Sequence, residues 1–225
     1  MRNDSSMKLL LGTNIYGDNI RQDIAQESWM YLEKKFPDTF KPIAIQFKSE
    51  DLRLKYLNDF LTYSDYKIDV EYVLESSSKD LCLTHKELPI TKEVFSNIYR
   101  LAKERGYTHF GYVNSDCILT EAFINHIQNN NITATAFSRF DIEPVNSFND
   151  LKTNGVKIVR CEIAGFDCFV FSVDWYEKYQ DLFKCYFIGI TLSLIILAVC
   201  LVLSRGLAYI TLIFFFLKMF FNIST

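Results

Sequence analysis

The sequence alternates between the hydrophobic periodicities of strands and helices, and this alternation constrains the fold more than any other feature. Short apolar runs predict buried strands at residues 7–12 and 42–47, and residues 67–73 alternate as a half-buried strand does. Residues 19–35 and 52–61 carry apolar stripes with helical spacing. Strands that alternate with helices predict an α/β layered domain with a mostly parallel sheet.

The same alternation continues through the second half of the chain. Thr91 is a predicted N-cap of a helix that ends at Gly106, and Thr120 is predicted to begin a shorter helix. A last helix, capped by Ser172 or Asp174, is expected to run to about Lys184. The further predicted strands are residues 108–114, 132–137, 156–163 and 167–172. Because strands dominate this later section, we expect the sheet to become mixed here.

Charge is distributed very unevenly along the chain. From Phe183 to the end the charged side chains are Lys184, Arg205 and Lys218. We therefore divide the chain into a domain of residues 1–185 and a hydrophobic tail of residues 186–225. The formal net charge of −3 gives no indication of a nucleic-acid-binding surface. Six cysteines without metal-site or disulfide-framework spacing are interpreted as buried free thiols.

The tail has more than one interpretation. The uncharged run of residues 187–203 lies at the lower limit of length for a helix that crosses a bilayer, and Arg205 interrupts it before a second apolar run. The tail is then a membrane anchor, as one transmembrane helix or a helical hairpin, or a remnant of a shifted reading frame. Either origin predicts membrane association through the tail, with the preceding domain cytoplasmic. The third interpretation is a hairpin buried in a core.

The segment GYVNSDCILT, residues 111–120, places polar side chains at the tip of a predicted strand. In open α/β sheets, ligands bind at this carboxyl edge. Strand periodicity predicts that Asn114 and Asp116 point the same way. The Asp116 carboxylate could hold a divalent cation, and the Asn114 carboxamide could bind a phosphate or ribose oxygen or the cation. Alternatively, these residues cap the next helix or form an Asx turn.

Two other predicted strands have polar neighbours. Arg139 and Asp141 follow the strand of residues 132–137, and Asp167 leads into the strand that ends at Ser172. Arg139 could hold phosphate charge, Asp141 could orient Arg139 or bind a sugar hydroxyl, and Asp167 could act as a base. The alternatives are a surface ion pair between Arg139 and Asp141, and a simple turn at Gly165.

Together these segments resemble, in the same order, a family of glycosyltransferase-like proteins with the GT-A nucleotide-diphospho-sugar transferase fold. In that family an Asn-Ser/Gly-Asp element stands where other GT-A enzymes have Asp-x-Asp, and an Arg-x-Asp and a Gly-x-Asp-x-Phe-x-Phe follow. The resemblance covers roughly residues 7 to 190. Its segments are QDIAQESWMYL (22–32), KELPITKEVFSNIYRLA (86–102), GYVNSDCILT (111–120), FSRFDI (137–142) and GFDCFVFS (165–172).

The resemblance implies a Rossmann-like α/β domain that binds a nucleotide-diphospho-sugar together with Mg²⁺ or Mn²⁺. Asp116 would be the metal ligand, and Asp167 would be the catalytic residue that faces the acceptor. The residues implied to lie at the donor are Thr13, Asn114, Arg139 and Asp141.

Two departures from the family pattern bear on activity. Asn114 removes one negative charge relative to Asp-x-Asp, so the cation should bind less tightly. After Ile190 the apolar tail replaces residues that normally complete the acceptor side, so the domain is C-terminally truncated. We expect a glycosyltransferase domain, active or degenerate, that transfers sugar to a hydroxyl acceptor, with the metal and Arg139 stabilising the leaving diphosphate. The alternatives are a non-catalytic sugar-nucleotide- or glycan-binding module and a membrane-tethered scaffold.

Overall fold

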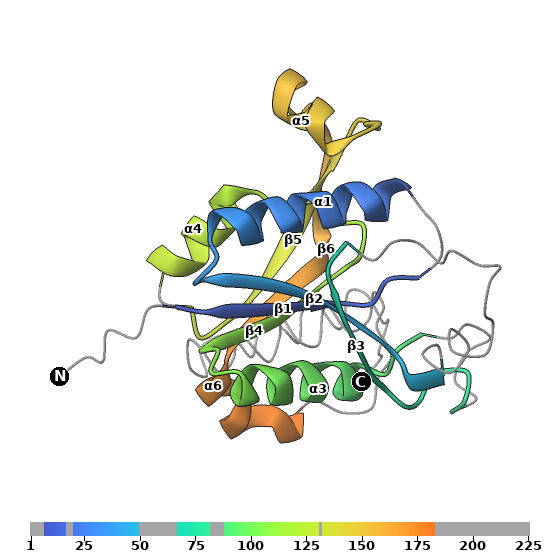
Figure 1. The fold of residues 1–225 in the computed structure, drawn as a ribbon, viewed down its shortest axis with the longest axis vertical. Helices are drawn as coiled ribbons and strands as arrows, with labels where there is room; N and C mark the ends of the chain where they lie inside the picture. Colours follow the sequence, from blue (N-terminus) through green and yellow to red (C-terminus); the bar gives the residue numbers. More distant parts are fainter. Residues whose placement is uncertain (1–6, 17–19, 50–66, 82–87, 131, 183–225) are drawn as a thin grey trace, which may run out of the picture.

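The computed structural model describes residues 7–16, 20–49, 67–81, 88–130 and 132–182. A six-stranded sheet with the order β3-β2-β1-β4-β6-β5 lies at its centre (Figure 1). The strands are β1 (Leu9–Thr13), β2 (Phe40–Phe47), β3 (Asp69–Leu74), β4 (His109–Val113), β5 (Ala134–Ile142) and β6 (Ile158–Ser172). The first four strands pair in parallel, whereas β6 is antiparallel to both β4 and β5. The predicted α/β class with a sheet that is first parallel and then mixed is therefore confirmed.

Helices cover both faces of this sheet (Figure 1). They are α1 (Ile20–Lys35), α3 (Thr91–Glu104), α4 (Glu121–Asn129), α5 (Phe148–Asn154) and α6 (Val173–Tyr179), which a 3-10 turn (Gln180–Leu182) follows. Helices α1 and α4 pack on one face, and α3 and α6 pack on the other. Each face consequently has its own apolar core.

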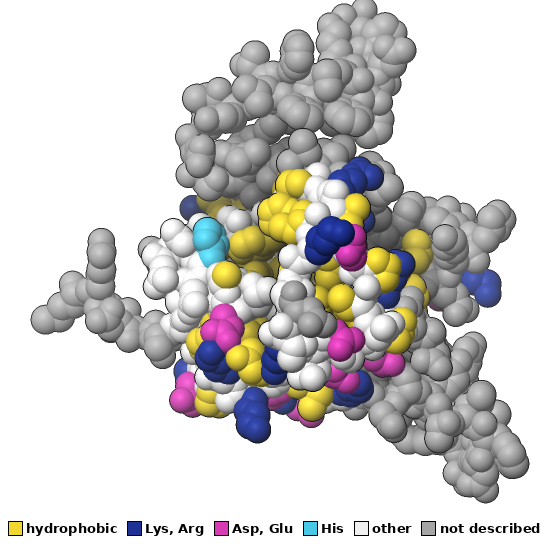
Figure 2. Space-filling view, turned by 90° about the horizontal axis from the view of Figure 1, so that it is seen from above, with side chains coloured by type: hydrophobic (Ala, Val, Ile, Leu, Met, Phe, Trp, Pro, Cys, Tyr) yellow, Lys and Arg dark blue, Asp and Glu magenta, His cyan; other side chains and the backbone are white. Residues whose placement is uncertain are grey.

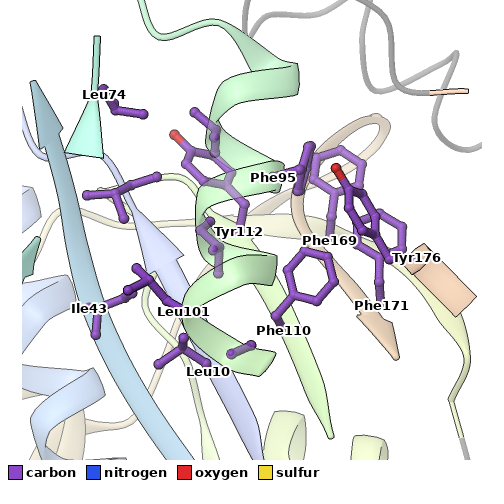
Figure 3. Packing of buried hydrophobic residues seen from close by; sticks show 14 of the residues in the cluster. Leu10, Ile43, Leu74, Phe95, Leu101, Phe110, Tyr112, Phe169, Phe171 and Tyr176 are labelled. Atoms are coloured by element: carbon purple, nitrogen blue, oxygen red, sulfur yellow. The ribbon is translucent and has the colours of Figure 1, made fainter. Parts of the chain in front are cut away.

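Strand β1 contributes to both cores, which explains its continuous apolar sequence. Leu9 and Leu11 join Trp29 of α1 in one buried cluster. Leu10 joins Phe95 of α3 in the other, whose aromatic side is shown in Figure 3. A strand that is buried on both faces has no solvent side on which polar residues would alternate.

Strands β5 and β6 continue past β4 as a two-stranded arm. Strand β4 pairs with the C-terminal third of β6, while the pairs from Phe140↔Cys161 to Ile142↔Ile158 join only β5 and β6. Helix α5 connects the two strands at the far end of the arm (Figure 1). Phe140 and Val159 are exposed on the arm, and the view from this end shows apolar and charged side chains interspersed (Figure 2).

The structure corrects several local predictions. The strands predicted at residues 156–163 and 167–172 are one continuous strand, β6, which pairs with β5 on both sides of a shift in register near Ser138. Gly165 therefore lies inside a strand, not at a turn before one, and Asp167 lies in the C-terminal part of the same strand. Helix α5 was not predicted.

Helix caps are partly as predicted. The N-cap of α3 is Ile90, with β-region dihedral angles, and Thr91 is the first helical residue, so that prediction was one residue off. Gly106 adopts a φ of 72° just past the helix, as expected of a C′ glycine. Ser172 rather than Asp174 caps α6, since its side chain accepts a hydrogen bond from the Trp175 backbone.

Two predictions fall on segments outside the described residues. These are the helix of residues 52–61 and the hydrophobic tail of residues 186–225. Within the described ranges, no helix is both long and apolar enough to cross a bilayer.

Candidate functional site

Polar residues from three adjacent strands meet where β4 ends. Asn114 follows β4 directly, Asp167 lies in β6, and Arg139 lies in β5. The register that pairs Val113 with Cys168 brings Asn114 opposite Asp167, and the Asn114 backbone N–H donates to the Asp167 carbonyl at 2.9 Å. Residues far apart in sequence are thus joined at the carboxyl edge of the parallel half of the sheet.

The Asp167 carboxylate joins the other two side chains. Its Oδ1 accepts from Asn114 Nδ2 at 2.5 Å, and its Oδ2 accepts from Arg139 Nη1 at 2.9 Å. The Asp167 side chain is only 9% exposed. A carboxylate so buried requires a compensating charge and hydrogen bonds, and Arg139 and Asn114 supply both.

Arg139 is held between two carboxylates. Its Nε donates to Asp141 Oδ1 at 2.8 Å while Nη1 bonds to Asp167. The hydrogen bond to Asp141 raises the pKa of Arg139, partial burial opposes this, and the charge of Asp167 adds to it. The guanidinium stays charged and is 45% exposed, and Nη2 has no hydrogen-bond partner in the described part of the chain. The group therefore has a free, oriented edge for an anion.

Asp116 lies beside this group without bonding to it. The Cys117 backbone N–H donates to the Asn114 carbonyl at 3.1 Å and closes a turn, so strand periodicity ends before Asp116. The prediction that periodicity aligns Asn114 and Asp116 does not apply to this turn. Asp116 is exposed, and within the described ranges its carboxylate has no hydrogen-bond or ion-pair partner. It remains available to a ligand.

The Cys117 thiol shows that the charged residues share one site. Burial raises the pKa of Cys117, the charges of Asp167 and Asp116 raise it further, and Arg139 lowers it. The thiol is thus within electrostatic range of all three side chains. Neither structural alternative for the strand tip is realised, because Thr120 is the N-cap of α4 and the Asn114 amide bonds to Asp167.

Thr13 lies at the same edge, at the end of β1. Pairing of Gly12 with Tyr112 places Thr13 beside the last residue of β4. The hydroxyl groups of Thr13 and Ser115 are both buried and have no hydrogen-bond partner within the described residues. Such groups are costly when left unsatisfied, so their position next to Asn114 supports a polar ligand at this edge. Asn14, the next residue, ties β1 to β2 by donating to Gln46 Oε1 at 2.6 Å.

Sequence reasoning missed other residues of this edge. Tyr112 is buried, and the charge of Asp116 acts on its hydroxyl group. Burial raises the pKa of Tyr112. Tyr16 is 68% exposed and is near enough to Tyr112 to contribute to raising the pKa of Tyr112. An exposed aromatic residue just after a strand was the one available signal, whereas Tyr112 and Cys117 look like core residues in the sequence.

A separate cleft of about 450 Å³ lies where the ends of β2 and β3 meet helix α3. Its lining side chains are mostly polar: Lys48, Val73, Glu75, Ser76, Glu93, Asn97 and Arg100. Glu93 accepts hydrogen bonds from the backbone of Glu75 and Ser76. The cleft has the size of a small-ligand site, and its lining suits a polar molecule.

The donor set for a divalent cation is small. Within the described ranges no three His, Cys, Asp or Glu residues are close enough to hold an ion together. Asp141 and Asp167 are engaged with Arg139, which leaves Asp116. Mg²⁺ in nucleotide sites typically binds one or two carboxylates together with phosphates and water. The residues therefore fit an ion that binds together with a diphosphate, and they do not fit an ion held by protein ligands alone.

Comparisons with known proteins leave the family open. No protein-family model matches the sequence, and no curated protein sequence matches it. Among solved structures, the chain is similar to the crystal structure of 4-diphosphocytidyl-2C-methyl-D-erythritol synthase, with a TM-score of 0.40 and 8% identity. That match covers 86% of this chain and 85% of the other. The glycosyltransferase resemblance of the sequence therefore stays a prediction.

Proposed function

We propose that the carboxyl edge of the sheet binds a nucleotide-diphospho-sugar and transfers its sugar to a hydroxyl acceptor. The observation that carries this proposal is the free edge of Arg139, fixed by Asp141 and Asp167 and adjacent to Asn114 and Asp116. A cation oriented in this way at the ends of parallel strands is suited to a phosphate-bearing ligand.

Each residue of the edge has a role in this mechanism. Arg139 stabilises the negative charge that develops on the leaving diphosphate while the acceptor hydroxyl attacks the anomeric carbon. Asp116 would hold a divalent cation, which, when bound, neutralises diphosphate charge. Thr13 and Asn114 contact the donor near its phosphates. Tyr16 and the cleft where β2 and β3 meet α3 leave room for the nucleoside.

A second candidate function is binding of the sugar nucleotide without transfer. Asp167, the predicted catalytic residue, has both carboxylate oxygens engaged, by Asn114 and by Arg139. A general base needs a free acceptor close to the attacking hydroxyl. The pairing with Arg139 and the burial of Asp167, whose side chain is 9% exposed, both weaken it as a base and favour a binding module.

We also propose that residues 186–225 attach the domain to a membrane, with the domain on the cytoplasmic side. The support is the apolar sequence of the tail. Flotation of the full chain with lipid vesicles tests this, and recovery of the chain only in the soluble fraction would contradict it.

The test of the proposed function is a melting-temperature screen of the full chain in detergent against UDP-, GDP- and CDP-sugars, with and without Mn²⁺. A ligand at 100 times its Kd should stabilise the fold by about 2.7 kcal/mol. We expect a shift for one nucleotide class, its loss in Arg139→Ala, and loss of its Mn²⁺ dependence in Asp116→Ala. Lys157→Ala is the matched control, because it removes an exposed cation from the same arm.

The results of this screen distinguish sugar transfer from binding of the sugar nucleotide without transfer. No shift with any sugar nucleotide, or an unchanged shift in Arg139→Ala, contradicts nucleotide binding at this edge. A shift accompanied by release of nucleoside diphosphate in the presence of acceptors indicates transfer. A shift without release under any acceptor indicates the binding module.

A further inference from the structure

We propose that Asp167 is a positioning residue, which fixes the orientation of Asn114 and Arg139 toward the ligand and requires a neutral side chain at position 114. The proposal deepens the proposed function of the same site and rests on it. It assigns Asp167 a role in organising the donor side, in place of the acceptor-side role that the sequence predicts.

The first argument concerns the amide of Asn114. An ionised carboxylate only accepts hydrogen bonds, so the amide must turn its Nδ2 toward Asp167. The Asn114 Oδ1 is then presented away from Asp167. Asn114 consequently offers the ligand a carbonyl oxygen, which suits a hydroxyl group or a cation and does not suit a phosphate oxygen.

The second argument concerns the guanidinium of Arg139. Asp167 and Asp141 bind different nitrogen atoms of one rigid plane, Nη1 and Nε. Two fixed points orient the plane and leave the Nη2 edge for the ligand. The Asp141 side chain is 38% exposed and that of Asp167 is 9% exposed, so Asp167 is the more constrained of the two anchors. A cation held in advance loses little entropy when a phosphate binds.

The third argument explains why position 114 carries Asn. The residue stands opposite Asp167 across the β4–β6 pair, and its backbone N–H already bonds to the Asp167 carbonyl. An aspartate there would set two acceptor-only carboxylates against each other at hydrogen-bond distance. Asp116 and Asp141 add negative charge near this group, and Arg139 is already paired with Asp141 and Asp167. A further carboxylate at position 114 would therefore add negative charge beside a cation that already has two carboxylate partners.

The test is a charge swap between the two positions. In Asp167→Asn the amide at 167 keeps its oxygen on Arg139 and turns its nitrogen to Asn114, which must then reverse its own amide. In the double variant Asn114→Asp/Asp167→Asn, the amide at 167 again bonds to Arg139 and donates to the carboxylate at 114. The hydrogen-bonded chain is restored, with the partners exchanged. Asp141→Asn is the matched control, because it removes the more exposed anchor.

Affinity for the sugar nucleotide found in the screen is measured by calorimetry. We expect Asp167→Asn to weaken binding at least tenfold, Asp141→Asn to weaken it less, and the double variant to bind more tightly than Asp167→Asn. Asn114→Asp is measured as the other single variant. Equal affinity in wild type and Asp167→Asn, or losses in the double variant that are the sum of those in Asp167→Asn and Asn114→Asp, overturns the proposal. All four variants are nearly isosteric with the wild type, and circular dichroism confirms that each is folded.

A ligand-free measurement decides the proposal if no sugar nucleotide binds and the proposed function fails. In Asn114→Asp two acceptor-only carboxylates face each other, so its melting temperature at about pH 7 should lie below that of the wild type. The double variant should recover part of this loss, because the hydrogen-bonded pair is restored with its partners exchanged. Equal melting temperatures of the wild type and Asn114→Asp, or losses of the two single variants that simply add in the double variant, count against a coupled pair.

Discussion

His109 is a half-buried titratable residue at the opposite, amino end of β4. Its Nε2 lies 2.8 Å from the Ile132 carbonyl and its Nδ1 lies 2.9 Å from the Thr108 hydroxyl. Burial lowers the pKa of His109, although the hydrogen bond to Ile132 and the charge of Asp174 oppose this. The neutral imidazole is thus the form that the fold prefers.

A pH dependence of stability follows from this lowered pKa. Below about pH 6.5 the unfolded state binds a proton at this position more readily than the native state does. The free energy of unfolding therefore decreases as the pH is lowered, until the pH passes the pKa of the folded state. We expect His109→Gln to flatten the stability profile between pH 7.5 and 5, as measured by urea unfolding. His126→Gln, at an exposed position of helix α4, is the control. Equal slopes in the wild type and His109→Gln would refute a role for His109.

At the residue scale, the sequence singled out three residues that the structure brings into contact, but it did not predict how they are joined. Asn114, Arg139 and Asp167 were all predicted from their neighbouring strands. Their contact depends on β6 running antiparallel beside β4 and on the register that places Asn114 opposite Asp167. Neither is encoded in the local pattern of one strand. The turn predicted at Gly165 divided β6 into two strands and placed Asp167 at the start of the second.

At the scale of elements, Gly111 of β4 leaves no room for a side chain against β6. A Cβ built on Gly111 would lie 2.2 Å from the Phe169 carbonyl oxygen and 3.0 Å from Leu11 Cδ1. The first conflict is with backbone, which cannot rotate away as a side chain can. Glycine at this position is what allows the antiparallel pair that carries Asn114 and Asp167.

We therefore expect Gly111→Ala to force β4 and β6 apart. The free energy of unfolding in urea should fall by at least about 2 kcal/mol, the scale of overpacking in a filled core. Gly106→Ala provides a contrast, because no atom lies within 4 Å of a Cβ there and only its φ of +72° is unfavourable. Its expected loss is about 1–2 kcal/mol. An unchanged urea midpoint in Gly111→Ala would show that β4 and β6 can accommodate the added methyl group without loss of stability.

Elements with strong periodicity were predicted well, and those defined by tertiary contact were not. Helices α1 and α3 and strands β1 to β4 follow apolar patterns that fit one or two buried faces. Helix α5 has no such stripe; its N-cap is Ser147, and it packs on α1 through Phe148 and Tyr31, whose ring centroids are 5.8 Å apart. The sequence also did not predict that β6 is one strand. Its first residues, in the arm, are exposed and its last residues are buried, so the two parts have different hydrophobic patterns.

For the molecule as a whole, the two apolar cores raise the question of whether they unfold together. They lie on opposite faces of the sheet, but β1, β4 and β6 supply residues to both. Loss of either core removes the support of those shared strands. The described part of the chain should therefore behave as one cooperative unit.

The two tryptophans of the sequence allow this to be tested, since each reports on one face. Trp29 is buried in the core beneath α1, and Trp175 packs against the core beneath α3. Urea unfolding of Trp29→Phe and Trp175→Phe, each followed by its remaining tryptophan and by circular dichroism, should give coincident optical transitions within each variant. The midpoint of Trp29→Phe should be the lower, because Trp29 is 1% exposed and its replacement leaves a cavity. A fluorescence transition that precedes the circular dichroism transition in only one variant would show that one face melts independently. The site at the sheet edge would then depend on the more stable face alone, and cooperative support of Asn114, Arg139 and Asp167 by the whole sheet would be excluded.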